Sequence, residues 1–219
     1  MEIEPAQLAF DIICFLAPQG AGKDTHARLL AAKLPKEAVV EISMSGVLRH
    51  YRKKDPKFDA LVERIMARGK LVGDAIVVER LLMYISEECV GKKLFILNGF
   101  PRSAAQAFGL WAIALRLIPG TPRIGVIQLM LETDKAFKRC MQRRAEMIQR
   151  KETPREDDNP TEIRERLETY EDNLPGIIAA LRLFATIVEI DADQPIETVE
   201  KLVTDAVIGG NVETTEDCE

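Results

Sequence analysis

The sequence has no long apolar run, no paired cysteine motif and no excess of positive charge. Its longest apolar runs, residues 12–17 and 110–115, are far shorter than the roughly 20 residues of a membrane-spanning helix. The four cysteines are scattered without a CxxC pair, which argues against a disulfide framework and a zinc site. The net charge of −5 argues against sequence-independent binding of nucleic acids, which depends on positive charge. Together with an acidic N-terminus that lacks the order of a secretion signal, these features predict a cytoplasmic protein that binds neither membranes nor nucleic acids.

Short apolar runs alternate with amphipathic stretches along the 219 residues, a length that suits one domain with small insertions. The apolar runs are nearly continuous, which is typical of strands buried on both faces of a parallel sheet. Strand alternating with helix predicts an α/β three-layer sandwich, with a five-stranded parallel sheet and helices on both faces. The expected strands are residues 12–17, 38–44, 94–98, 124–131 and 187–191. The expected helices are residues 26–33, 58–66, 75–86, 104–115, 135–148 and 161–184, and a loop is expected at 145–154.

A glycine-rich segment, APQGAGKDT (residues 17–25), connects the first expected strand to the first expected helix. Glycines at such a turn let backbone N–H groups converge on a phosphate, and Lys23 adds a full charge at the positive end of the helix. The segment departs from the usual phosphate-loop pattern twice, because Ala17 replaces the first glycine and Asp24 replaces the hydroxyl residue after the lysine. It predicts a phosphate-binding loop, and the alternative is an ordinary strand–helix turn with an exposed lysine.

Five segments taken together resemble the adenylate kinase family. Besides the glycine-rich segment, they are ISMSGVLR (42–49), GKLVGD (69–74), NGFPR (98–102) followed by Gln106, and REDD (155–158) followed by Arg164, Leu167 and Tyr170. They occur in the family's order and spacing, from about residue 11 to residue 206. The resemblance implies the P-loop kinase fold in a single domain, residues 1–208, with a nucleoside-monophosphate-binding insertion at about 44–73 and a short lid at about 144–165. Residues 209–219 begin with two glycines and end acidic, so a disordered tail is expected.

On the acceptor side, the resemblance implies that Arg49 and Arg102 hold the phosphate of the monophosphate through bidentate hydrogen bonds. Gln106 would read the base, because an amide presents both a donor and an acceptor to the edge of adenine. The remaining contacts to the acceptor would come from Met44, Leu71, Val72, Gly99, Arg155 and Arg164.

On the donor side, the family's pattern asks for two arginines four residues apart, one on the adenine and one on the phosphates. Arg139 and Arg143 have this spacing, and Arg144 competes for the second role. The donor nucleotide would also contact the main chain near Gln194 and the loop residues Gly20, Ala21, Gly22, Lys23, Asp24 and Thr25. The catalytic residues that the resemblance implies are Lys23, Arg102, Arg143, Arg155 and Arg164.

The resemblance implies ATP as the phosphoryl donor with Mg²⁺, which Thr25, Asn98 and Asp24 would hold mostly through water and phosphate. Asn98 replaces the family's aspartate, so it keeps a hydrogen-bonding oxygen and loses a charge. We expect Asp24 to restore part of that charge beside the same phosphates; the alternative is that Asp24 caps its helix or pairs with Lys23. A structural zinc is not expected, because the segment between Arg144 and Arg155 has no cysteine or histidine.

We therefore predict an adenylate kinase, which reversibly transfers the terminal phosphoryl group of MgATP to AMP and yields two ADP. Two alternatives stay open. A kinase with a different or broader acceptor range, such as UMP and CMP, is compatible with Met44, which replaces a threonine that contacts adenine in relatives. A nucleotide-binding protein that has lost catalysis is compatible with Ala17 and Asn98. Nucleotides are the expected partners, and a monomer is the expected state.

Overall fold

The centre of the protein is a five-stranded parallel sheet, seen in a computed structural model that describes residues 8–66, 72–153 and 159–209. Its strand order is β2–β3–β1–β4–β5, and each neighbouring pair is parallel. This confirms the predicted α/β class and sheet. Only the strand nearest the C-terminus begins earlier than predicted, because its first residues lie half-exposed at the sheet edge and carry a weak apolar signal. The strands are β1 (Ile12–Leu16), β2 (Val39–Ser43), β3 (Leu94–Asn98), β4 (Ile124–Met130) and β5 (Ala185–Asp191).

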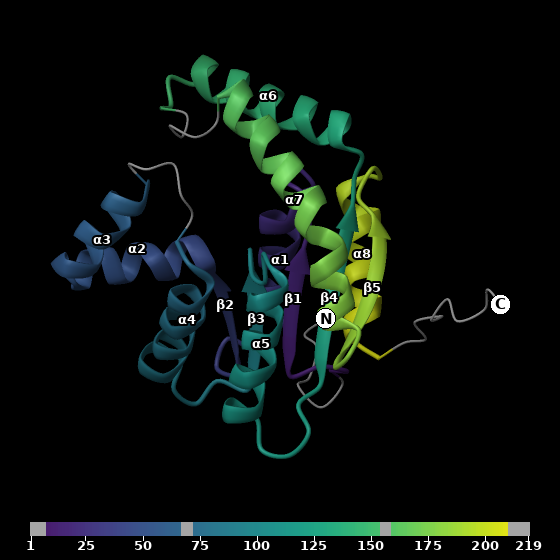
Figure 1. Ribbon diagram of the computed structural model, residues 1–219. Coiled ribbons are helices and arrows are strands. Elements are labelled where there is room, and N and C mark those ends of the chain that lie inside the picture. The colour runs from purple at the N-terminus through teal and green to yellow at the C-terminus, as the bar shows by residue number, and fades with distance from the viewer. Residues whose placement is uncertain (1–7, 67–71, 154–158, 210–219) are drawn as a thin grey trace.

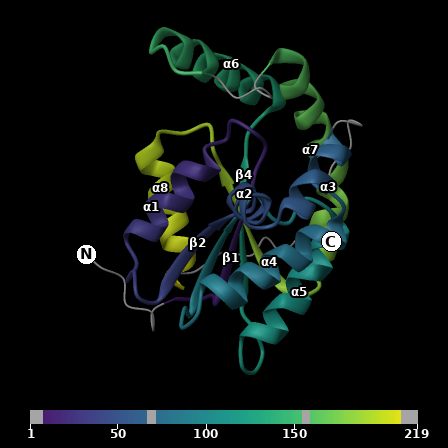
Figure 2. The same cartoon turned by 90° about the vertical axis from the view of Figure 1, so that its left-hand side faces the viewer.

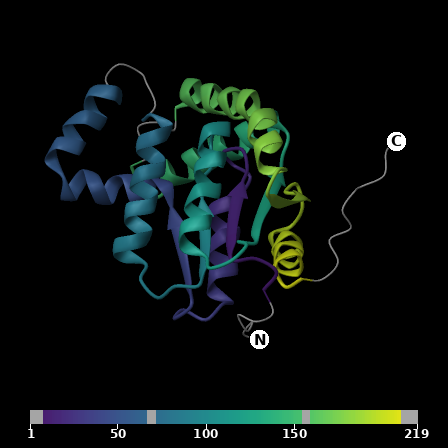
Figure 3. The same ribbon diagram turned by 60° about the horizontal axis from the view of Figure 1, so that its bottom comes forward.

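Helices cover both faces of this sheet and complete the three layers (Figure 2). On one face lie α1 (Lys23–Ala32) and α8 (Ile196–Val207). On the other lie α4 (Asp74–Glu88), α5 (Ala104–Leu117) and α7 (Pro160–Leu181). The pair α2 (Met44–Lys54) and α3 (Pro56–Met66) projects to one side of the sheet, and α6 (Thr133–Gln149) lies above its carboxyl edge (Figures 1 and 3).

The central strand β1 is buried on both faces, which explains its continuous apolar sequence. Ile12, Cys14 and Leu16 belong to the core under α4, α5 and α7. Ile13 and Phe15 point the other way, into the core under α1 and α8. Because successive side chains of a strand alternate between faces, a strand covered twice needs apolar residues at every position.

The segment that was expected to be a loop at residues 145–154 is helical in its first half. Its first residues, AEMIQ, include strong helix formers, and they extend α6 to Gln149. The helix ends at Lys151, whose φ of 58° is left-handed, and the N–H groups of Lys151 and Glu152 donate to the carbonyls of Ile148 and Met147. This is a Schellman ending with lysine in the position that glycine usually occupies.

The start of α7 follows from its local sequence. Asn159 is the N-cap, and its Oδ1 accepts the backbone N–H of Glu162 at 3.0 Å. Pro160 is the first helical residue, where its missing N–H has no cost. Within the described residues, no helix has the length and apolar character needed to cross a lipid bilayer. The acidic stretch 210–219, which was expected to form a tail, lies outside those residues.

Replacing Gly125 with alanine is expected to destabilise the fold by about 1–3 kcal/mol, as overpacking of a tight core does. A Cβ at Gly125 in β4 would lie 2.5 Å from the ring of Phe10, whose side chain is buried. Denaturant unfolding would measure the loss. Gly73→Ala is the matched control, because a Cβ there meets no heavy atom within 4 Å and its φ of −61° suits any residue. Equal stability of the two variants would contradict this reading of the β4 core.

Candidate functional site

The glycine-rich loop lies at the carboxyl end of the central strand and leads directly into α1. Gly20 and Gly22 have positive φ values of 95° and 87°, and Gly22 caps α1 without a side-chain hydrogen bond. The positive end of the α1 dipole therefore lies at this turn, where a bound anion would be stabilised. A Cβ at Gly20 would lie 2.6 Å from the carbonyl oxygen of Ala136 in α6, so only glycine fits this close approach.

Charged and amide side chains meet beside this loop. Lys23 is largely buried, with a side chain 21% exposed, and its Nζ lies 3.8 Å from Oδ1 of Asp24. The same oxygen accepts a hydrogen bond of 2.8 Å from Nδ2 of Asn98. Asn98 ends β3 and is 4% exposed, and β3 neighbours β1 in the sheet. Two residues 74 positions apart are thus joined next to the phosphate loop.

Glu41 of β2, a residue that the sequence analysis did not single out, is electrostatically coupled to this pair. Burial raises the pKa of the Glu41 carboxyl, Asn98 and Arg28 lower it, and the charge of Asp24 raises it. The neutral amide of Asn98 therefore acts on two carboxylates. A third carboxylate at position 98 would face both with like charge, which accounts for asparagine there. The signal in the sequence was a lone glutamate inside the apolar run VVEIS.

Arg102 lies in the turn that follows β3. Its Nε donates to the carbonyl of Gly99 at 2.8 Å, and Gly99 has a φ of 75°. Desolvation by the surrounding protein lowers the pKa of the Arg102 guanidinium, and the positive charge of Arg166 lowers it further. The negative charge of Asp24 raises the same pKa. Arg102, Arg166 and Asp24 thus act on one another electrostatically, although they come from the β3–α5 turn, α7 and α1.

The structure brings Arg166 of α7 to the phosphate loop and keeps Arg164 elsewhere. Nη1 of Arg166 donates to Oε1 of Gln19 at 3.4 Å. The guanidinium of Arg164 lies over the ring of Phe137 in α6, at 4.2 Å from the centroid. Residues two positions apart on a helix point about 200° apart, so both cannot face the loop. The structure therefore places Arg166, rather than Arg164, beside the phosphate loop, while the role of Arg164 toward the phosphates stays a prediction.

Two residues expected to contact the acceptor, Gln106 and Met44, have buried side chains, and the amide of Gln106 is also hydrogen-bonded within the protein. Gln106 is 5% exposed, and its amide bonds the backbone N–H of Arg102 and the carboxylate of Asp74. Met44 is 4% exposed and packs in the core under α4 and α5, so its side chain belongs to the core rather than to an open surface. Arg49 is exposed on α2 and donates to Ser45 of its own helix. Val72 is half-buried just before α4, whereas Leu71 and Arg155 lie outside the described residues.

The expected donor residues gather between α6 and the loop that follows β5. Arg139 donates to the carbonyl of Ala192 and to Oδ1 of Asp193, both at 3.0 Å. Gln194 belongs to the same loop, so the two segments expected to enclose the donor base lie side by side. Arg143 and Arg144 are both half-buried on α6, and the choice between them stays a prediction.

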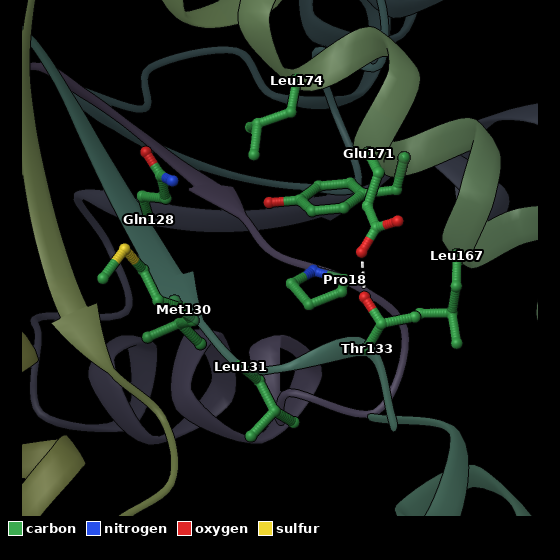
Figure 4. A pocket seen from close by; sticks show the side chains of 10 residues that line it. Pro18, Gln128, Met130, Leu131, Thr133, Leu167, Glu171 and Leu174 are labelled. Carbon is green, nitrogen blue, oxygen red and sulfur yellow. Dashed lines mark hydrogen bonds between the residues drawn. The ribbon is translucent and has the colours of Figure 1, made fainter. Parts of the chain in front are cut away.

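A small cavity lies behind the phosphate loop, between the end of β4 and α7 (Figure 4). Its volume is about 160 Å³, below the roughly 300–1,000 Å³ of ligand pockets. Pro18, Leu131, Leu167 and Leu174 line it, and Thr133 bonds Glu171 across it (Figure 4). Its small size excludes a nucleotide, so the candidate site is the loop and its surrounding cations.

The oxygen atoms beside the loop suit a hard cation. The carboxylate of Asp24 and the hydroxyl of Thr25 stand in the first turn of α1, and oxygen ligands are those that Mg²⁺ prefers. Among the described residues, no three His, Cys, Asp or Glu side chains form a group that could hold a metal ion.

Comparisons with known proteins agree with the site. The family model described as adenylate kinase matches residues 15–184. An adenylate kinase of Xanthobacter autotrophicus is 31% identical over 191 residues, covering 85% of this chain and 93% of that protein. An adenylate kinase of Xylella fastidiosa is 30% identical over 196 residues, covering 89% and 98%. One of Stenotrophomonas maltophilia is 28% identical over 197 residues, covering 90% and 99%.

Proposed function

Since this chain belongs to the adenylate kinase family, it transfers a phosphoryl group from MgATP to AMP, and we propose that Lys23, Arg102 and Arg166 carry the transfer. One observation carries the residue assignment. In a protein with a net charge of −5, cations from three distant segments gather around the phosphate loop. Such local gathering is what an acidic protein needs to hold two anionic nucleotides.

The physical problem in this reaction is charge. Two unit charges of the same sign 4 Å apart repel by about 4 kcal/mol at an effective dielectric constant near 20. Fixed arginines and a lysine offset that repulsion, and the protein needs no covalent nucleophile. Planar guanidinium groups such as those of Arg102 and Arg166 can each bind two phosphate oxygens.

The donor triphosphate would lie on the N–H groups of the phosphate loop, residues 20–25, with Lys23 on its phosphates. Its base would lie between α6 and the loop after β5, against Arg139 and the main chain near Gln194, with Arg143 reaching the phosphates. The acceptor would lie on the opposite side of Arg102, between the α2–α3 pair and α5. The proposed contacts of the acceptor nucleotide are Arg49, Gly99, Gln106, Leu71, Val72 and Arg155. Met44 would support the site from the core side.

Mg²⁺, when bound, would neutralise negative charge that develops on the phosphates during transfer. We propose that Asp24, Thr25 and Asn98 hold its water shell. The hydrogen bond from Asn98 fixes the carboxylate of Asp24 beside the loop, which supports this role over simple helix capping.

We also propose that the insertion at about 44–73 and the lid at about 144–165 close over the bound nucleotides, because an open site would let water compete for the phosphoryl group. We propose that the protein is a monomer, and light scattering would test this. Cys14 and Cys89 are free and buried, which suits the reducing cytoplasm.

Formation of ADP from MgATP with AMP, UMP, CMP and GMP tests the proposed acceptor. We expect AMP to give a kcat/KM at least ten times that of the other three. A Lys23→Met variant purified in parallel controls for contaminating host kinase, and we expect it to lose about 10²–10³-fold in kcat. Faster transfer to UMP or CMP would assign the enzyme to another acceptor. No transfer to any of the four would mean a nucleotide-binding protein without catalysis.

A further inference from the structure

A closed network of hydrogen bonds joins the first residue of α4 to the first turn of α5. Oδ1 of Asp74 accepts from Nε2 of Gln106 at 2.7 Å, and Oδ2 of Asp74 accepts from Oγ of Ser103 at 2.8 Å. Ser103 is the N-cap of α5 and accepts the N–H of Gln106 at 3.1 Å. Oε1 of Gln106 accepts the backbone N–H of Arg102 at 2.8 Å. The buried side-chain amide of Gln106 is thus hydrogen-bonded through both its oxygen and its nitrogen.

These two contacts determine which way the amide of Gln106 faces. Its oxygen must face the N–H of Arg102, because an NH₂ group there would meet another donor. Its nitrogen must face Asp74, because an ionised carboxylate only accepts hydrogen bonds. Within the described residues, no partner is recorded for the second N–H of Gln106 or for the second lone pair of its oxygen. One donor and one acceptor, in a known order, are left for a ligand.

We infer that Asp74 is a positioning residue that selects the base of the acceptor nucleotide through the orientation of Gln106. An amide in this orientation matches an edge with an acceptor beside an amino group, as N1 and N6 of adenine present. The same amide orientation disfavours hypoxanthine, because the N1–H of that base donates and its O6 accepts, so donor would face donor and acceptor would face acceptor. The inference rests on the proposed role of Gln106 toward the acceptor, and it adds Asp74, which gives the amide its direction together with the backbone N–H of Arg102.

The test compares AMP with IMP, which have the same sugar, phosphate and ring size and inverted polarity at this edge. Asp74→Ala removes the acceptor that holds Nε2, so we expect the ratio of kcat/KM for AMP over IMP to fall about tenfold. Asp74→Asn keeps one oxygen that can accept from Nε2, so it should retain most of the ratio. Calorimetric Kd values for the two monophosphates would give the same ratio without turnover.

Two further variants separate orientation from helix stability. Ser103→Ala removes the N-cap of α5 and the other hydrogen bond to Asp74, and a lost cap costs about 1 kcal/mol. It leaves the bond between Asp74 and Gln106, so the AMP/IMP ratio should stay within about twofold. Should Asp74→Ala be unfolded at the assay temperature, Asp74→Thr replaces it, because its hydroxyl is one bond too short to reach Nε2.

The outcomes distinguish this inference from the proposed function. An equal loss for both substrates in Asp74→Ala would reduce Asp74 to a structural residue and overturn the inference. An unchanged ratio, or an equal fall in Ser103→Ala, would overturn it as well. A parent enzyme that fails to use AMP would instead contradict the proposed function, whatever the variants do.

Discussion

Replacing Arg166 with alanine is expected to lower kcat about a thousandfold, whereas replacing Arg164 with alanine lowers it less than tenfold. An arginine that stabilises a transferring phosphoryl group is worth about 10³–10⁵ in kcat. Arg166 can act in this way, because it contacts Gln19 of the phosphate loop and its charge acts on Arg102. Steady-state kinetics at saturating ATP and AMP would measure both variants.

The two arginines form a matched pair, because the same chemical change is made two positions apart on one helix. The guanidinium of Arg164 lies over Phe137, and a cation–π contact at such a site is worth about 0.5–1 kcal/mol. Its loss should therefore appear in thermal unfolding more than in kcat. Arg166→Lys keeps the charge but loses the planar fork, so its kcat should be intermediate. A larger loss of kcat in Arg164→Ala than in Arg166→Ala would instead assign the contact with the transferring phosphoryl group to Arg164.

Replacing Asp24 with asparagine is expected to raise the Mg²⁺ concentration for half-maximal activity about 10–100-fold, the usual effect of losing an outer-shell partner of a metal. Asp24 carries the carboxylate that Asn98 holds beside the loop at 2.8 Å. Calorimetry of ATP binding with and without Mg²⁺ gives a readout besides turnover, and the advantage that Mg²⁺ confers should shrink. Glu41→Gln is the control, because it removes the other carboxylate that Asn98 influences. An unchanged Mg²⁺ dependence in Asp24→Asn would leave Asp24 as a helix cap or a partner of Lys23.

The reciprocal change tests why this chain has an amide at position 98. Asn98→Asp alone would place a third acid between Asp24 and Glu41, and like charge together with burial raises the pKa of such a carboxyl. A carboxyl whose pKa is raised in the folded state contributes less stability as pH rises, so the variant should lose stability relative to the parent between about pH 4 and pH 7. The exchange Asp24→Asn with Asn98→Asp restores the charge count, and its Mg²⁺ dependence should approach that of the parent. No difference between the single and the exchanged variants would contradict a shared role.

Short-range patterns in the sequence were enough for the sheet, the phosphate loop and the cap of α7. A strand covered on both faces needs apolar residues throughout, a tight turn beneath a phosphate needs glycine, and Asn159 caps a helix with its own side chain. Each of these requirements is met within a few residues. The loop expected at 145–154 was wrong in its first half, where the helix predicted at 135–148 continues to Gln149 and is followed by a left-handed lysine rather than a glycine.

The partners across the site could be decided only by the folded chain. Asn98 meets Asp24 because β3 neighbours β1 in the sheet, and no local pattern gives that strand order. Arg166 rather than Arg164 meets Gln19, 147 positions away, because the packing of α7 determines which face of the helix turns toward the loop. The amino-acid sequence by itself therefore determined the five strands, most of the helices and the position of the glycine-rich turn. The tertiary structure decided which side chains complete the site, because contacts between distant segments depend on strand order and helix rotation.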